Sequence, residues 1–77
     1  MNKRYAVAFS DNGDVILELV NAESPIEAIL EHSSMKASRD LSKMIRDHQL
    51  SGSTLEELKE DISYGMFYVD VKEILDE

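Results

Sequence analysis

The hydrophobic pattern at the start of the chain predicts a β-hairpin. Two short apolar segments, residues 5–9 and 15–20, flank the polar sequence SDNG at residues 10–13. Polar connections that contain glycine join antiparallel strands, and both flanking segments are rich in aromatic and β-branched side chains. We therefore expect a hairpin over residues 4–20.

The register of this hairpin decides which side chains share a face. A two-residue loop at residues 12–13 would bring Glu18 to the face that carries the aromatic side chains of the first strand. A type I turn over residues 10–13, with a bulge at Gly13 in a left-handed conformation, shifts the pairing by one residue and brings only apolar side chains there. We expect the second register because its face is entirely apolar. Its members are Tyr5, Val7, Phe9, Val15, Leu17 and Leu19.

Capping signals and helical periodicity predict three helices after the hairpin. Ser24 is expected to be the N-cap of the first helix, with Pro25 as its first residue and Glu27 closing a capping box. Ser53 and Glu56 predict a second capping box at the start of the last helix. The helices are expected near residues 25–33, 36–50 and 54–64.

A third strand is expected at residues 66–72, where Phe67, Val69 and Val71 alternate with other side chains. The acidic tail, residues 73–77, is expected to fray. The chain is thus predicted to be one α+β domain, residues 1–77, with the order β-β-α-α-α-β. Its helices would pack on one face of a three-stranded antiparallel sheet in which the third strand pairs with the first.

The composition argues against several classes of protein. The chain of 77 residues has no cysteine, so neither a disulfide framework nor a thiolate metal site can form. Its longest apolar run is far shorter than the roughly 20 residues that span a bilayer, and the N-terminal residues lack the features of a signal peptide. We expect a cytoplasmic protein that does not bind membranes.

The residue types needed for catalysis are not arranged in a catalytic pattern. His32 and His48 lack the spacing of metal ligands, and both are interpreted as structural. The serines lie outside any nucleophile motif, and the isolated glycines form no phosphate loop. Residues 11–14 resemble the start of a calcium loop but lack its downstream glutamate. We therefore expect no enzyme, no cofactor, no metal and no small-molecule substrate.

Charge is segregated between two predicted helices. The chain has 16 acidic and 8 basic residues, a net charge of −8, which argues against general nucleic-acid binding. The two groups are interpreted either as solvated helix faces with i,i+4 pairs or as binding surfaces. The basic stripe consists of Lys36, Arg39, Lys43 and Arg46, and the acidic surface of Glu56, Glu57, Glu60 and Asp61.

The second face of the sheet is the strongest candidate for a binding site. If the helices cover only the first face, the second keeps an apolar patch, and such patches usually mark interfaces. A second copy of the chain or another protein would cover it, unless one helix crosses to this side. In the expected register its members are Ala6, Ala8, Ile16, Glu18, Val20 and Tyr68.

The N-terminal layout resembles a group of phage proteins. The segment YAVAF at residues 5–9 is followed by a turn and by VILELVNAESPIEAI at residues 15–29, a hairpin that runs into an A-x-S-x-x-E-A helix. This layout is similar to that of many short uncharacterised proteins of bacteriophage and prophage origin. The resemblance covers about the first 30 residues. It implies a protein that binds and modulates a host protein, in some cases as an acidic mimic of DNA.

Three functions follow as hypotheses. The first is a non-catalytic protein-binding module, either homodimeric or bound to a host or partner protein, that acts through the open sheet face and its charged rim. The second is a DNA mimic that inhibits a nucleic-acid-binding protein, and the third is weak nucleic-acid binding through the basic helix at residues 36–46. The mimic would use Glu56, Glu57, Glu60, Asp61, Asp70, Glu73, Asp76 and Glu77.

Overall fold

The computed structural model describes residues 2–11 and 13–75. Within them, a three-stranded antiparallel sheet and four helices follow the order β-β-α-α-α-α-β, which confirms the predicted α+β class. The elements are β1 (Lys3–Asp11), β2 (Asp14–Ala22), α1 (Pro25–Glu31), α2 (Ser33–Ala37), α3 (Arg39–Ser51), α4 (Leu55–Tyr64) and β3 (Phe67–Ile74).

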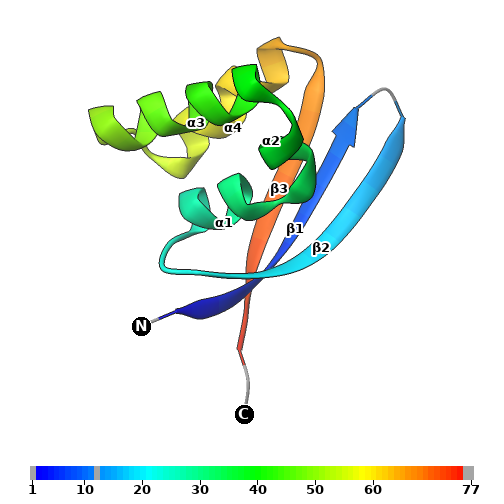
Figure 1. The fold of residues 1–77 in the computed structure, drawn as a ribbon, viewed down its shortest axis with the longest axis vertical. Coiled ribbons are helices and arrows are strands. Elements are labelled where there is room, and N and C mark those ends of the chain that lie inside the picture. The colour runs from blue at the N-terminus through cyan, green and yellow to red at the C-terminus, as the bar shows by residue number, and fades with distance from the viewer. Residues whose placement is uncertain (1, 12, 76–77) are drawn as a thin grey trace.

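The sheet has the order β2-β1-β3, and β1 pairs in antiparallel fashion with both neighbours. The third strand therefore pairs with the first, as predicted. The four helices lie together on one side of this sheet (Figure 1). β3 extends to Ile74, so the tail predicted at residues 73–77 begins inside a strand, and residues 76–77 lie outside the described part.

The N-cap of α1 forms as the sequence predicts, but the Glu27 side chain makes no return bond to the Ser24 N–H among the hydrogen bonds of the described residues, so the predicted capping box is only half formed. The Ser24 hydroxyl accepts a hydrogen bond from the Glu27 N–H at 3.2 Å, and Pro25 is the first helical residue. The helix predicted near residues 36–50 is instead two helices, α2 and α3. The chain is extended at Ser38 between them, and the Ser38 hydroxyl caps α3 by accepting the Leu41 N–H at 3.2 Å. When a serine inside a helical apolar pattern uses its hydroxyl to cap a new helix, the single helix that the pattern predicts is divided into two.

The cap of α4 is one residue later than predicted. Thr54, not Ser53, is the N-cap, and Glu57, not Glu56, completes the capping box. The reason is that the Ser53 N–H donates to the His48 carbonyl at 3.0 Å, which makes Ser53 part of the C-terminal turn of α3. That turn requires a left-handed residue, and Gly52 supplies it with φ +75°.

The register of the hairpin differs from the prediction. Asp11 pairs with Asp14, and Val7 pairs with Glu18, so only residues 12–13 connect the strands. Gly13 has the positive φ that was expected, +112°, but without the shift of one residue that a bulge would add. The prediction of an entirely apolar face is therefore wrong. Glu18 faces the helices, and the three aliphatic residues Val15, Leu17 and Leu19 face away from them.

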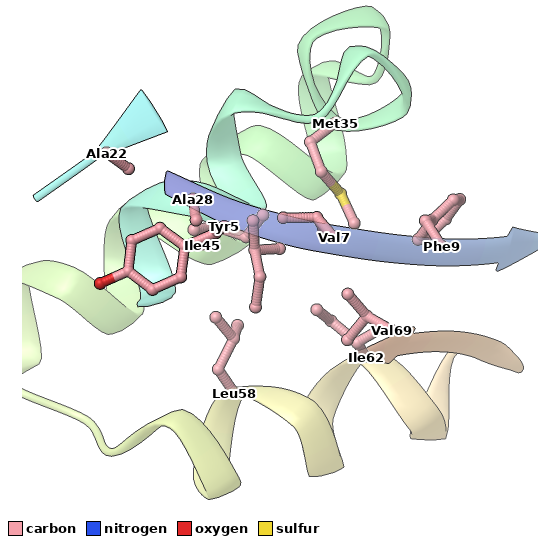
Figure 2. Packing of buried hydrophobic residues seen from close by; sticks show 11 residues of the cluster. Tyr5, Val7, Phe9, Ala22, Ala28, Met35, Ile45, Leu58, Ile62 and Val69 are labelled. Atoms are coloured by element: carbon pink, nitrogen blue, oxygen red, sulfur yellow. The ribbon is translucent and has the colours of Figure 1, made fainter. Parts of the chain in front are cut away.

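The core lies between the sheet and the helices. The side chain of Val7, in the central strand, is fully buried, and Leu58 and Ile62 of α4 approach it from one side (Figure 2). The apolar members of the core are Tyr5, Val7, Phe9, Ala22, Ala28, Ile29, Met35, Ile45, Leu58, Ile62 and Val69.

One polar side chain, His32, is fully buried in this core. Its Nδ1 accepts the Ser34 N–H at 3.1 Å and thereby caps α2. Nε2 therefore carries the hydrogen and donates it to the Ile16 carbonyl at 3.0 Å. Because both ring nitrogens form hydrogen bonds, the buried histidine has no unpaired polar atom, and its role is structural.

Replacement of Gly13 by valine should destabilise the protein by about 1–3 kcal/mol, because a β-branched residue resists positive φ. A Cβ at Gly13 would meet no atom within 4 Å, so the cost is conformational rather than steric. Urea unfolding followed by circular dichroism measures the change. Gly13→Asn is the matched control and should cost less, because asparagine tolerates positive φ better. Equal stability of the valine variant and the native chain would contradict the turn.

Candidate functional site on the outer face of the sheet

The side chains that point away from the helices form what we call the outer face. Side chains alternate between the two faces of a strand, and the buried residues of β1 and β3 identify the inner face. The strand pairing then assigns the outer face of all three strands. Its members are Arg4, Ala6, Ala8 and Ser10 of β1, Val15, Leu17, Leu19 and Asn21 of β2, and Tyr68, Asp70, Lys72 and Ile74 of β3.

A row of exposed aliphatic side chains follows β2 along this face. Val15, Leu17 and Leu19 are 61%, 65% and 63% exposed, whereas Val7 in the neighbouring strand is fully buried. Tyr68 adds an exposed aromatic ring on β3. Single exposed apolar residues are common, but a continuous row on one sheet face is typical of an interaction site.

The orientation of β2 is explained by Glu18. Its Oε1 accepts the Ser33 backbone N–H at 3.0 Å, and its Oε2 accepts the Ser33 hydroxyl. These bonds hold the pKa of Glu18 below its ordinary value of 4.5. Since Ser33 is the first residue of α2, the carboxylate also satisfies a backbone donor at the start of that helix. An inward Glu18 requires that its neighbours Leu17 and Leu19 point outward.

The predicted binding face is therefore corrected in half of its members. Ala6, Ala8 and Tyr68 lie on the outer face, as expected. The other three lie on the helix side: Glu18 binds Ser33, Val20 packs against the core, and Ile16 borders a hollow near the hairpin end. The Asn-Gly dipeptide, which favours a two-residue loop, was the signal for this register. The functional residues that the sequence-based prediction missed are Val15, Leu17 and Leu19.

The hollow near the hairpin end has a volume of about 460 Å³. It lies where the hairpin extends beyond the helices, between the strands and the segment from α2 to α3. The aromatic rings of Phe9 and Phe67 stack at 5.5 Å in its wall. Two carboxylates, Asp11 and Asp14, stand at its rim, so the hollow can accept an apolar group that carries a positive charge.

The predicted charged surfaces are only partly free. Lys36 belongs to α2, pairs with Glu31 at 3.3 Å, and is separated from the rest of the basic stripe by the break at Ser38. The other members, Arg39, Lys43 and Arg46, lie exposed on α3.

On the acidic surface, Glu56 and Glu60 are exposed on α4. Glu57 is held by the Thr54 N–H of the capping box, and this backbone bond lowers its pKa. Asp61 is bound to His48. Two of the four predicted acidic residues therefore serve the internal structure.

A chain of hydrogen bonds links serine, histidine and aspartate between α3 and α4. His48 contacts the Ser53 hydroxyl through Nδ1 and Asp61 Oδ2 through Nε2, each at 2.8 Å. This pairing could not be predicted from the sequence because Asp61 lies 13 positions after His48. The depression beside it is lined by three carboxylates, Asp40, Asp47 and Asp61, and by a single cationic side chain, Lys43, so its net negative charge would oppose the oxyanion of an acyl-transfer reaction. We therefore assign these contacts to fastening the end of α3 to α4.

The described residues contain neither a metal-binding cluster nor a membrane-spanning helix. No group of three histidine, aspartate or glutamate side chains within 2–11 and 13–75 is placed to hold a metal ion. Across the same residues, no helix has the length and apolar character needed to cross a membrane.

Replacement of Glu18 by glutamine tests the contact with Ser33. The folded-state pKa of Glu18 is lowered, so its contribution is complete above the unfolded value of 4.5 and is lost as the pH falls through the folded value. At pH 7 the variant should be less stable by about 1 kcal/mol, a small value because Glu18 is partly exposed. At pH 3 the difference should be smaller than at pH 7. Urea unfolding at both pH values measures it, with Glu60→Gln on the exposed side of α4 as the control. A difference that is the same at both pH values would contradict this role.

No protein-family model matches the chain, and neither a curated protein nor a solved structure is similar to it. The outer face therefore has to be interpreted from its own side chains.

Proposed function

We propose that this chain is a non-catalytic protein-binding module that acts through the outer face of its sheet. The observation that carries the proposal is the exposed row of Val15, Leu17 and Leu19 on a face that the helices leave bare. Contact of apolar surface with water is unfavourable by roughly 25 cal/mol per Å², so a partner that covers this row gains free energy. An open sheet face suits a protein surface better than a small molecule.

Charged side chains at the border of the row would orient the partner. Lys59 of α4 donates to Asp70 Oδ1 at 3.2 Å, and this bond, with that of the Val71 N–H, lowers the pKa of Asp70. Asp70 is thus a fixed negative charge on the outer face, beside the positive charge of Lys72. Complementary charges of this kind contribute to specificity and association rate more than to affinity.

The composition and the N-terminal layout support a cellular setting for this module. The lack of cysteine fits a reducing compartment such as the cytoplasm. The resemblance of the first 30 or so residues to short phage proteins supports a role as a phage-encoded modulator of a host protein. A net charge of −8 would favour a partner with a basic surface around the binding site.

The two alternative functions have less support. A DNA mimic needs free carboxylates, but Glu57 and Asp61 are bound within the chain, and residues 76–77 of the proposed set lie outside the described part. Nucleic-acid binding through residues 36–46 would need a continuous basic helix, which the break at Ser38 interrupts.

Photo-crosslinking in cells tests the proposed site. A photoreactive benzoylphenylalanine in place of Leu17 should form covalent adducts with another polypeptide, because this position would lie inside the interface. The same residue in place of Leu50 is the matched control, since Leu50 is an exposed leucine (87%) near the end of α3, away from the sheet. Leu19→Lys should reduce the adducts from position 17 by at least about tenfold, since a lysine in an apolar interface must be desolvated. Equal adducts from positions 17 and 50, or none from position 17, would contradict the proposal.

A further inference from the structure

The register arranges the outer face in rows that run across the three strands. Two rows lie on either side of the level of Val7, whose partners Glu18 and Val71 point inward. The row before this level consists of Ala6, Leu19 and Lys72, and the row after it of Ala8, Leu17 and Asp70. The two rows match: each has one alanine, one leucine and one charged side chain, and the two charges are opposite in sign.

This arrangement is complementary to itself. Consider a second copy packed face to face, related by a twofold axis that runs across the strands at the level of Val7. Such an axis places β2 over β2 of the second copy with the strands antiparallel, and it exchanges the two rows. Leu17 then faces Leu19 of the second copy, and Asp70 faces its Lys72. Every member of one row meets a side chain of matching character.

We propose that a second copy of this chain occupies the outer face in this twofold arrangement. This inference rests on the proposed function, because it names the partner of the same surface. The small side chains of Ala6 and Ala8 would let the two β1 strands approach closely. At the outer levels Tyr68 would face Ile74 and Arg4 would face Ser10, whereas Asn21 would face Val15, a polar side chain opposite an apolar one. The bonds that Asp70 accepts from Lys59 and from the Val71 N–H both use Oδ1.

The charges distinguish this axis from the other twofold packing of two sheets. An axis parallel to the strands would place β2 over β3 of the second copy. Leu17 and Leu19 would then cover Asp70 and Lys72, which would lose their hydration without gaining charged partners. The axis across the strands instead buries leucine against leucine and pairs each charge.

The size of the face sets the expected strength of the dimer. Three strands about 4.8 Å apart, with seven levels at about 3.3 Å each, cover roughly 15 by 23 Å. Two such faces have a projected area of about 700 Å² together, and the side chains that stand on them raise the accessible area that would be buried toward about 1,000 Å², the lower limit for a specific interface. We therefore expect a reversible dimer with a dissociation constant on the order of micromolar rather than nanomolar.

Sedimentation equilibrium of the purified chain from about 1 to 500 µM tests the dimer. The native chain should change from monomer to dimer over this range. Leu17→Lys should raise the dissociation constant by at least about a hundredfold, and the control Leu50→Lys should leave it unchanged within about twofold. Circular dichroism and urea unfolding should show that both variants keep the fold, because both positions are exposed.

Charge reversal tests the axis itself. Asp70→Lys alone places two lysines opposite each other at both symmetry-related contacts, and Lys72→Asp alone places two aspartates there. Each single variant should dimerise at least about tenfold more weakly than the native chain, because like charges across an interface are costly. A mixture of the two variants pairs every lysine with an aspartate, so dimers should return to within about threefold of native strength. This recovery also controls for the loss of the Lys59 contact in the Asp70 variant.

The outcomes separate this inference from the proposed function. A chain that remains monomeric at 500 µM, or a dimer that Leu17→Lys does not weaken, would overturn the homodimer. Failure of the mixed charge variants to recover would overturn the proposed axis. If position 17 still crosslinks to a polypeptide of different mass, the outer face binds another protein, and the proposed function stands without the second copy.

Discussion

The contact between Glu18 and Ser33 determines how the hairpin meets the helices. The carboxylate of a strand residue accepts both the backbone N–H and the hydroxyl of the first residue of α2. Two positions earlier on the same strand, the Ile16 carbonyl accepts a hydrogen bond from the buried His32 ring. Both contacts tie β2 to the start of α2 from the same face. Because a strand can present only alternate residues to one side, these contacts determine the orientation of the whole strand.

The apolar character of the outer face is a consequence of that orientation. Val15, Leu17 and Leu19 have the side chains of a core strand, yet they point away from every helix. Had β2 paired one residue out of step, these side chains would have joined the core, and Glu18 would have faced water. The chain thus keeps a polar contact inside and leaves an apolar row outside. A fold of this kind is most stable when a second surface covers that row, which is why binding is the function that we propose.

Many polar side chains of the types used in catalysis make hydrogen bonds that stabilise the fold. His48 joins Ser53 to Asp61 across the turn between α3 and α4, and His32 uses both ring nitrogens inside the core. Thr54 and Glu57 satisfy each other in a capping box. A chain of 77 residues with no cysteine has a small core and no disulfide bonds. Such hydrogen bonds therefore help to hold its short helices and strands together. On the outer face, by contrast, each of two neighbouring rows exposes a leucine, and the charged side chains of the two rows, Lys72 and Asp70, have opposite signs.

Interactions that span a few residues could be predicted from the sequence alone. Ser24 and Pro25 begin α1, Gly52 ends α3 and Gly13 takes a positive φ, because capping and backbone sterics act within about four residues. The α+β class and the pairing of β3 with β1 also follow from the pattern of the elements. For the register the local signals conflicted: the Asn-Gly dipeptide favoured the observed pairing and the apolar pattern favoured the other, and the contact that decides between them joins Glu18 to Ser33, 15 positions away. Apolar patterning alone favoured the wrong face of β2. Only the tertiary structure decided which side of this strand meets water, because it supplies the hydrogen-bond partners of the Glu18 carboxylate on the helix side.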